Sequence, residues 1–390
     1  MKYGIVHALL PGNEISMQQI VKKLQILSIW GLFTGLILSS MPSSAAIIEH
    51  LYEAEIAVSD QTRTTRHEVF KKAFQQVLIK VVGSSRVLGN PTIDDARDKV
   101  LKYVSQFRYR ELPAGFEQPL GADNKPGEIL YNNMLWIKFD VQAVNLLLRK
   151  SQLPVWGKQR PETLVWIAVR DGGQRYVLKQ RDISPIKDEI EKAAKLRGLP
   201  IRWPEYDEAD RSRLSFVDLW GGFWDNILTV SRRYEKESML VGRYFWAGNE
   251  WQVKWDLLTD KHQQYWQINS RDLALLSGSG IDKASDNISV KYALFLRESA
   301  GGNFYIDIHG VSSVDSYAKI TTYLRGLSPI KDLNASEVSS QGMRFKIDAR
   351  GSVADLKRLI ALGSLLKPVN VQVSTQQPLQ DDVILAYEMR

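Results

Sequence analysis

TLVWIAV, residues 163–169, is an almost unbroken run of apolar side chains near the middle of this 390-residue chain. A strand with apolar residues at both odd and even positions is typical of a sheet that is covered on both faces. The turn sequence DGG at 171–173 then leads into a second predicted strand at 175–179. The stretch therefore predicts the central strand of a layered sheet.

The residues that follow predict an α/β domain over 159–299. Strands and helices alternate along it and a hairpin closes the series, which is the order of a layered α/β fold. The predicted helices span 186–196 and 218–233, the second with Phe223 on its apolar face. Further strands are predicted at 199–203, 238–245, 250–257 and 265–269.

Residues 47–158 predict a small α+β domain. Its strongest helix, 66–82, carries apolar residues at helical spacing and is stopped by Gly83. The other predicted elements are strands at 53–59, 107–112 and 130–141 and helices at 94–104 and 143–150.

Residues 300–390 predict a third domain of ferredoxin-like plan. A polar stretch at 277–289 separates it from the middle domain, and a helix at 289–297 is the predicted bridge. The order β-α-β-β-α with one further strand is that of a split βαβ unit. Its elements are predicted at 304–308, 314–324, 332–339, 343–349, 353–362 and 369–373. The predicted fold class is therefore three small mixed domains, of α+β and α/β type.

Residues 17–46 have the features of a secretory signal peptide, with Met17 as the expected true start. Lys22 and Lys23 precede an uncharged apolar run at 26–40, and small residues at 42–46 suit cleavage. The run is shorter than the roughly 20 residues of a spanning helix, which favours cleavage; an uncleaved amino-terminal anchor is the alternative. We therefore expect a periplasmic protein, for which ATP, NAD and nucleic acid are poor candidate ligands.

The composition agrees with an exported protein held by its cores alone. The chain has no cysteine, which excludes disulfides and a lipid-modified cysteine. Its net charge is +7, and the predicted leader would remove three lysines and one glutamate, which leaves +5. This excess is spread along the chain, whereas nucleic-acid binding favours a clustered basic stripe. A weak attraction to anionic membrane or cell-wall polymers is compatible with it.

Catalytic motifs are missing from the sequence. It has no nucleotide-binding loop, no zinc-protease motif and no nucleophile elbow. The histidines after the leader are not at metal-pair spacing, so no metal, no cofactor and no catalytic residue is predicted. The acidic loop EYDEAD at 205–210 is the best carboxylate cluster. A glycosidase would need two such carboxylates at a fixed separation, but a solvated loop is the favoured interpretation.

Seven tryptophans fall within 203–266. Trp251 and Trp255 share one face of the predicted hairpin because side chains alternate along a strand. Such a face can stack sugars or anchor a partner protein. Packing of this face against the helix at 218–233 is the favoured alternative. The candidate contact surface consists of Trp251, Trp255, Trp224, Arg160, Arg232 and Arg233.

Four strings resemble one family of envelope proteins. They are YVSQFRYRE at 103–111, LPVWGKQRP at 153–161, RGLP at 197–200 and DLWGGFWDNILTVSRRY at 218–234. In this order they are similar to the family labelled domain of unknown function two thousand and sixty-six, from gammaproteobacterial envelopes. The resemblance covers residues 51–258 and implies no known activity.

Two more distant resemblances concern the fold alone. The first block is similar to the amino-terminal domain of the flagellar assembly protein T, and the second to the α/β domain shared with the amino-terminal part of TolB. They imply a non-enzymatic periplasmic assembly factor, although fold likeness is weak support for a function.

The sequence thus predicts an exported envelope protein that contacts envelope proteins or the cell wall and does not catalyse a reaction. The alternative is a cell-wall glycan-binding protein or hydrolase that uses the Trp-rich middle domain. A membrane-associated form of either follows if the signal is not cleaved.

Overall fold

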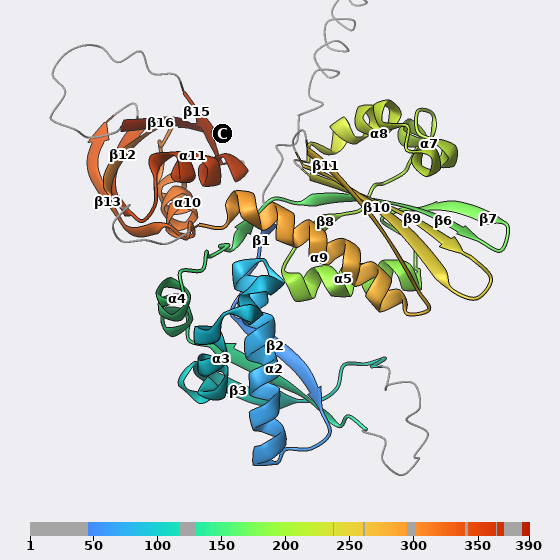
Figure 1. Cartoon of the computed structure of the whole chain (residues 1–390). Helices are drawn as coiled ribbons and strands as arrows, with labels where there is room; N and C mark the ends of the chain where they lie inside the picture. Colours follow the sequence, from blue (N-terminus) through green and yellow to red (C-terminus); the bar gives the residue numbers. More distant parts are fainter. Residues whose placement is uncertain are drawn as a thin grey trace, which may run out of the picture. The chain divides into compact units, whose positions relative to one another are not determined.

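The computed structural model describes residues 46–116, 130–236, 238–259, 262–294, 302–339, 342–363, 365–369 and 384–390. These residues belong to one compact unit, Ser43–Arg390. It is a mixed α+β structure with several small sheets (Figure 1). The predicted signal peptide lies outside the described residues except for Ala46. Among the described residues, no helix combines the length and the apolar character needed to cross a membrane.

The predicted central strand is β6 (Thr163–Asp171), which lies inside a six-stranded sheet. It pairs with β9 (Ser238–Trp246) in parallel and with β7 (Gln174–Leu178) antiparallel. Val165, Ile167 and Val169 belong to one buried cluster, and Leu164, Trp166 and Ala168 to another. Burial on both faces is therefore confirmed. The sheet order is β11-β10-β9-β6-β7, in which β10 spans Trp251–Thr259 and β11 spans His262–Ser270. The short strand β8 (Ile201–Arg202) also pairs with β6.

Helices cover both faces of this sheet, as Figure 1 shows. One layer contains α5 (Pro185–Arg197) and α9 (Leu273–Tyr292), and the other contains α7 (Phe216–Gly221) and α8 (Trp224–Ser231). The predicted single helix at 218–233 is wrong. Gly222 adopts a left-handed conformation with φ of 70°, which ends α7, and the chain restarts as α8 and the short 3₁₀ helix η3 (Arg232–Tyr234). Phe223, predicted on the apolar face, is instead 54% exposed.

The polar separator predicted at 277–289 is also wrong, since these residues lie within the 20-residue helix α9. Its buried face combines larger apolar residues such as Leu276 and Ile281 with small ones, among them Gly280, Ala284 and Ser285. A Cβ on Gly280 would lie 2.6 Å from the ring of Trp255. The serines and glycines that look like a linker therefore allow the helix to approach the sheet closely.

The amino-terminal part has a three-stranded sheet of order β2-β4-β3. The predicted helix at 66–82 is confirmed as α2 (Arg63–Val82), which ends at the left-handed Gly83. The helix predicted at 94–104 is too long: α3 (Pro91–Asp98) ends early, and β3 begins at Val104. The other elements are β1 (Ala46–Ile47), β2 (Glu53–Val58), η1 (Ser85–Gly89), η2 (Val100–Lys102), β3 (Val104–Arg110), β4 (Asn133–Phe139), α4 (Val141–Lys150), β5 (Gln159–Arg160) and, further on, α6 (Glu208–Arg211).

The carboxy-terminal part has a five-stranded sheet of order β13-β14-β12-β16-β15. Its β-α-β-β-α order agrees with the predicted series, and β12 and β16 pair in parallel. The strand predicted at 369–373 lies outside the described residues except for Val369. The elements are β12 (Gly302–His309), α10 (Val314–Arg325), β13 (Ile330–Ser339), β14 (Gly342–Ala349), α11 (Val353–Leu362), β15 (Leu366–Pro368) and β16 (Ile384–Met389).

Candidate functional site

The tryptophan face of the β9–β10 hairpin is part of the core. Trp255 is 0% exposed, its Nε1 donates a hydrogen bond of 3.3 Å to the Leu276 carbonyl oxygen, and its ring meets Tyr244 edge-on at 5.6 Å. Its placement in a contact surface is therefore wrong. Packing is the correct interpretation, but the partner is α9, because Leu276 belongs to that helix. Trp251 is half-buried beside Trp246, with ring centroids 5.3 Å apart.

Arg160, another residue of the predicted contact surface, is 0% exposed and joins two helix ends. Its guanidinium donates five hydrogen bonds of 2.6–3.2 Å, all to main-chain carbonyl oxygens. The acceptors are Gly157, Arg197, Gly198, Lys80 and Trp156. Arg160 is thus a buried structural residue, and its assignment to a contact surface is wrong.

The carbonyl oxygens around Arg160 explain how a buried guanidinium is tolerated. Lys80 lies in the last turn of α2, and Arg197 and Gly198 form the end of α5. Each helix end carries about half a negative charge, so two ends together balance about one cation. Burial lowers the pKa of the Arg160 guanidinium to about 9, which still leaves it charged at neutral pH. The segment WGKQRP at 156–161, part of the string LPVWGKQRP, therefore has a structural role.

Arg233 and the acidic loop form a closed ion-pair cluster. Arg233 donates to both carboxylate oxygens of Asp207, at 2.8 and 3.0 Å, and to Asp210 at 2.9 Å. Asp210 is buried and also accepts the Tyr234 hydroxyl. The hydrogen bonds from Arg233 lower the pKa of Asp207 to about 2. A glycosidase acid needs a raised pKa, so this geometry argues against catalysis here. The predicted solvated loop is wrong at Asp210, which is buried within the short helix α6.

Trp224 and Arg232 lie on the outer helical layer. Trp224 is half-buried against the cluster beneath α7 and α8, and Arg232 is exposed. Val217, 60% exposed, and Phe223 lie on the same layer. The structure thus brings Trp224 to a partly apolar surface, whereas it places Arg160 and Trp255 inside.

A wide part of the six-stranded sheet faces solvent beside α7 and α8. Ala168 and Val241 pack beneath those helices, and side chains alternate along a strand, so Arg170 and Phe245 share their face. The register places residues of five strands in rows across this face. We call it the open sheet face, defined by Arg170, Arg175, Phe245, Gln252, Lys254, Gln267 and Asn269, all exposed or half-buried.

The open sheet face combines cationic, aromatic and amide side chains. The Arg170 guanidinium lies 5.3 Å from the centroid of the Phe245 ring. Among the side chains of these strands that the structure describes on this face, Asp256 is the one carboxylate. It is buried and ion-paired with Arg243. Arg170, Arg175 and Lys254 therefore give the face a positive character, which attracts anionic or polar partners.

The glycine turn between α7 and α8 forms one border of this face. A Cβ on Gly222 would lie 3.0 Å from the Arg243 guanidinium and 3.9 Å from Trp224 Nε1. The turn therefore sits directly against the sheet and presents the exposed Phe223 beside it.

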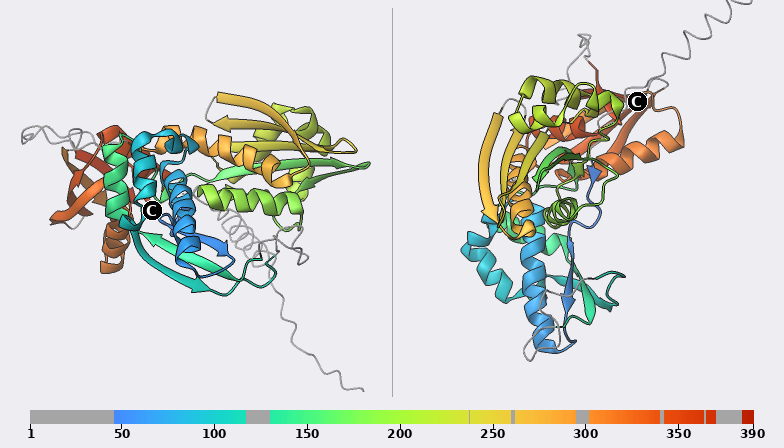
Figure 2. Two further views of the ribbon diagram at one scale, coloured as in Figure 1. Left: turned by 60° about the horizontal axis from the view of Figure 1, so that its bottom comes forward. Right: turned by 90° about the vertical axis from the view of Figure 1, so that its right-hand side faces the viewer.

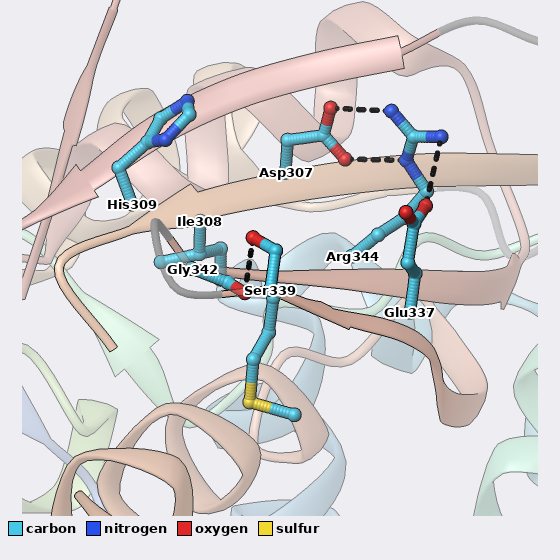
Figure 3. Close-up of a pocket in the computed structure, with 8 residues that line it drawn as sticks. Asp307, Ile308, His309, Glu337, Ser339, Gly342 and Arg344 are labelled. Atoms are coloured by element: carbon cyan, nitrogen blue, oxygen red, sulfur yellow. Dashed lines mark hydrogen bonds and ion pairs between the residues drawn. The ribbon is translucent and has the colours of Figure 1, made fainter. Parts of the chain in front are cut away.

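A small polar pocket of about 120 Å³ lies on the carboxy-terminal sheet, at the ends of β12, β13 and β14 (Figure 3). Arg344 holds Asp307 through two hydrogen bonds of 2.6 and 2.8 Å and lies 3.5 Å from Glu337. The Asp307 hydrogen bond raises the pKa of Arg344. Both carboxylates are thus engaged by one guanidinium, and the pocket is a weaker candidate than the open sheet face. Within the described parts of the chain, no three His, Asp or Glu side chains are placed to hold a metal ion.

Comparison with known families adds one match. Residues 45–157 match the model of a family described as a domain of unknown function (DUF8605). This range overlaps the predicted amino-terminal domain and differs from the family that the sequence strings resemble, so that resemblance stays a prediction. No curated protein matches the chain.

Sequence reasoning missed the open sheet face. Gln252 and Lys254 alternate with Trp251, Val253 and Trp255, so the polar positions of the same strand were the available signal. The contribution of Arg170 and Phe245 depends on the parallel pairing of β6 with β9. A pairing between strands so far apart in the chain is not visible in the local pattern.

Proposed function

We propose that the chain is an exported envelope protein that acts by binding and not by catalysis, with the open sheet face as its contact surface. The observation that carries this proposal is the row of exposed and half-buried cationic, aromatic and amide side chains across five strands. Aromatic residues and arginine are enriched where proteins meet partners, and a sheet already holds their backbone in place, so binding has to order the side chains alone. The expected export signal and the resemblance to assembly factors support the periplasm as the location.

The finer fold assignment belongs to the same proposal. We propose a TolB-like α/β fold for the middle part, supported by the helices on both faces of its sheet. We propose a ferredoxin-like plan for the last part, supported by the order β12, α10, β13, β14, α11. In that part β16 lies between β12 and β15, which adds a strand to the plain four-stranded plan. The division into three domains at 47–158, 159–299 and 300–390 stays a prediction.

A charge-reversal experiment tests the contact surface. Arg170→Glu with Lys254→Glu inverts the charge of the open sheet face, whereas Lys72→Glu with Lys99→Glu makes the same change at exposed positions of the amino-terminal part. We expect tagged wild-type protein and the control variant to recover the same defined complex from envelope extracts, and the first variant to lose it. Equal recovery by all three proteins would refute the contact surface.

A cell-wall glycan is the alternative partner, and one observation favours it. Gln263, Tyr265, Gln267 and Asn269 form a ladder on β11, in which the Tyr265 hydroxyl and the Gln267 amide each make a 3.4 Å hydrogen bond to the next side chain. Planar amides and aromatic rings suit sugar recognition. Peptidoglycan pull-down that depends on Phe245 and Lys254, with Trp251→Ala as the comparison, would favour this alternative. Hydrolysis of the glycan would further identify an enzyme.

The export proposal has its own test. Mass spectrometry of the protein from fractionated cells should show a processed amino terminus at Ile47 in the periplasmic fraction. An intact leader in the membrane fraction would indicate the anchored form, and an intact leader in the cytosol would contradict export.

A further inference from the structure

Strand β11 is an edge of the six-stranded sheet (Figure 2). It pairs with β10 over nine consecutive residue pairs, from Trp251 opposite Ser270 to Thr259 opposite His262, without a register shift. None of the strands that the structure describes pairs with its other side. An edge of this kind presents a row of N–H and C=O groups that can template a further strand.

Proteins usually protect such edges with charged residues, proline, bulges or short length. β11 has none of these: its sequence is HQQYWQINS, and its one titratable group besides Tyr265 is His262 at the first position. The other edge strands differ, both β7 at the opposite edge of the same sheet and those of the three- and five-stranded sheets. β2 carries Glu53 and Glu55, β3 carries Arg108, Arg110 and a register shift, β7 has five residues with Arg175, β13 carries Lys331, Asp332 and Glu337 with two register shifts, and β15 has three residues and ends at Pro368.

The sequence of β11 is complementary to itself in antiparallel orientation. With Trp266 at the centre, Tyr265 of one copy lies opposite Gln267 of the other, and Gln263 lies opposite Asn269. These pairs place amide opposite amide and hydroxyl opposite amide, with no like charges opposed. On the other face, Lys283 of α9 lies over the Trp266 ring at 4.8 Å, and Asn287 accepts a 2.5 Å hydrogen bond from Gln264. Lys283 and Asn287 thus contact β11 side chains within the same copy of the chain.

We propose that β11 pairs with β11 of a second copy of this chain, antiparallel about Trp266, and joins the two six-stranded sheets into one. The pairing is isologous, because the same edge serves both copies. The pairing gives the outward N–H and C=O groups of β11 hydrogen-bond partners on a second copy, which is present wherever the chain itself is present. The open sheet faces of the two copies then become continuous, since Gln267 and Asn269 lie at the junction.

The test uses opposite charge variants of the full chain in sedimentation velocity. Tyr265→Lys with Gln267→Lys places like charges opposite each other across the junction, and Tyr265→Glu with Gln267→Glu does the same with the other sign. We expect wild-type dimers, a rise of about tenfold or more in the dimer dissociation constant for each variant alone, and restored dimers when the two variants are mixed. Circular dichroism and thermal unfolding confirm that each variant is folded.

Two controls make the result specific to this strand and register. Ser336→Lys with Val338→Lys adds the same charge to exposed positions of β13 and should leave the dimer intact. Because the chain has no cysteine, Tyr265→Cys with Gln267→Cys should form an intermolecular disulfide, whereas Gln263→Cys with Gln267→Cys should not. Any of three results would overturn the proposal. The first is a wild-type monomer at about 100 μM, a concentration at which a dimer with a dissociation constant of about 100 μM is half-formed. The others are charge variants that dimerise like the wild type and a mixture of the two variants that stays monomeric.

Discussion

Replacing Arg160 with methionine should destabilise the folded chain strongly, although Arg160 was expected at a contact surface. The change removes donors from five carbonyl oxygens and the positive charge from two helix ends. Methionine has a similar length, so the volume of the site is roughly preserved. The effect therefore isolates the polar contribution of the guanidinium.

The magnitude follows from opposing contributions. Hydrogen bonds from a charged donor contribute about 1.5–3 kcal/mol each, but burying the cation costs several kcal/mol. Removing one side of a buried charged network costs about 3–5 kcal/mol in measured cases. We expect a loss in this range for Arg160→Met. With a urea dependence of about 3 kcal/mol/M, the unfolding midpoint would fall by about 1–2 M.

Urea denaturation followed by tryptophan fluorescence measures this loss. Arg160→Lys keeps the charge but has three donors and no planar fork, so its midpoint should lie between those of the wild type and Arg160→Met. Arg232→Met removes an exposed arginine and should change stability by less than about 0.5 kcal/mol. If Arg160→Met were as stable as Arg232→Met, the interpretation of Arg160 as a cap of two helix ends would be wrong.

Three further predictions concern the packing beneath the sheet and the charge near Arg160. Gly280→Ala should destabilise the protein by about 1–3 kcal/mol in the same assay, because the new Cβ meets the Trp255 ring. Gly278→Ala is the control: its Cβ meets nothing within 4 Å, so it should stabilise the helix by up to about 1 kcal/mol. If Gly278→Ala were the less stable of the two variants, the packing of α9 on Trp255 would be refuted. Trp255→Ala should cost about 3–5 kcal/mol, with any loss of ligand binding at 25 °C restricted to the unfolded fraction. Burial lowers the pKa of Lys80 from 10.5 to about 8. The resulting contribution to folding stability is complete above pH 10.5 and is lost as the pH falls through 8. The stability of the wild type relative to Lys80→Met should therefore rise by about 2 kcal/mol between pH 7 and 10, and a stability difference that does not change with pH would contradict this.

The parts of the fold that sequence predicted well have local signals. The run at 163–169 indicated burial on both faces, and Gly83 indicated the end of α2, because a left-handed residue after an apolar stripe is a local feature. The failures have a common cause. Ser277, Gly280 and Ser285 were interpreted as a polar linker, whereas in a closely packed helix small residues are the buried ones.

The candidate site was harder to predict because its chemistry depends on contacts between distant segments. Arg160 stands in a string that was noticed, but three of its five acceptors lie at the ends of two helices, 80 and about 37 residues away. A sequence pattern shows that a residue is unusual and does not show which carbonyl oxygens surround it. The same holds for the row that joins Arg170 to Phe245, which exists only through the pairing of β6 with β9.

The alternation along β10 decides which substitutions can test function at all. Trp251, Val253 and Trp255 point toward α9 and the core, and Gln252 and Lys254 point to the open sheet face. A tryptophan variant changes the stability of the whole sheet, so a loss of binding in it has two explanations. A Lys254 variant removes an exposed charge and leaves the packing unchanged, so a loss of binding in it has one. The physical argument therefore moves the functional test by one residue along the strand, from the conspicuous aromatic positions to their polar neighbours.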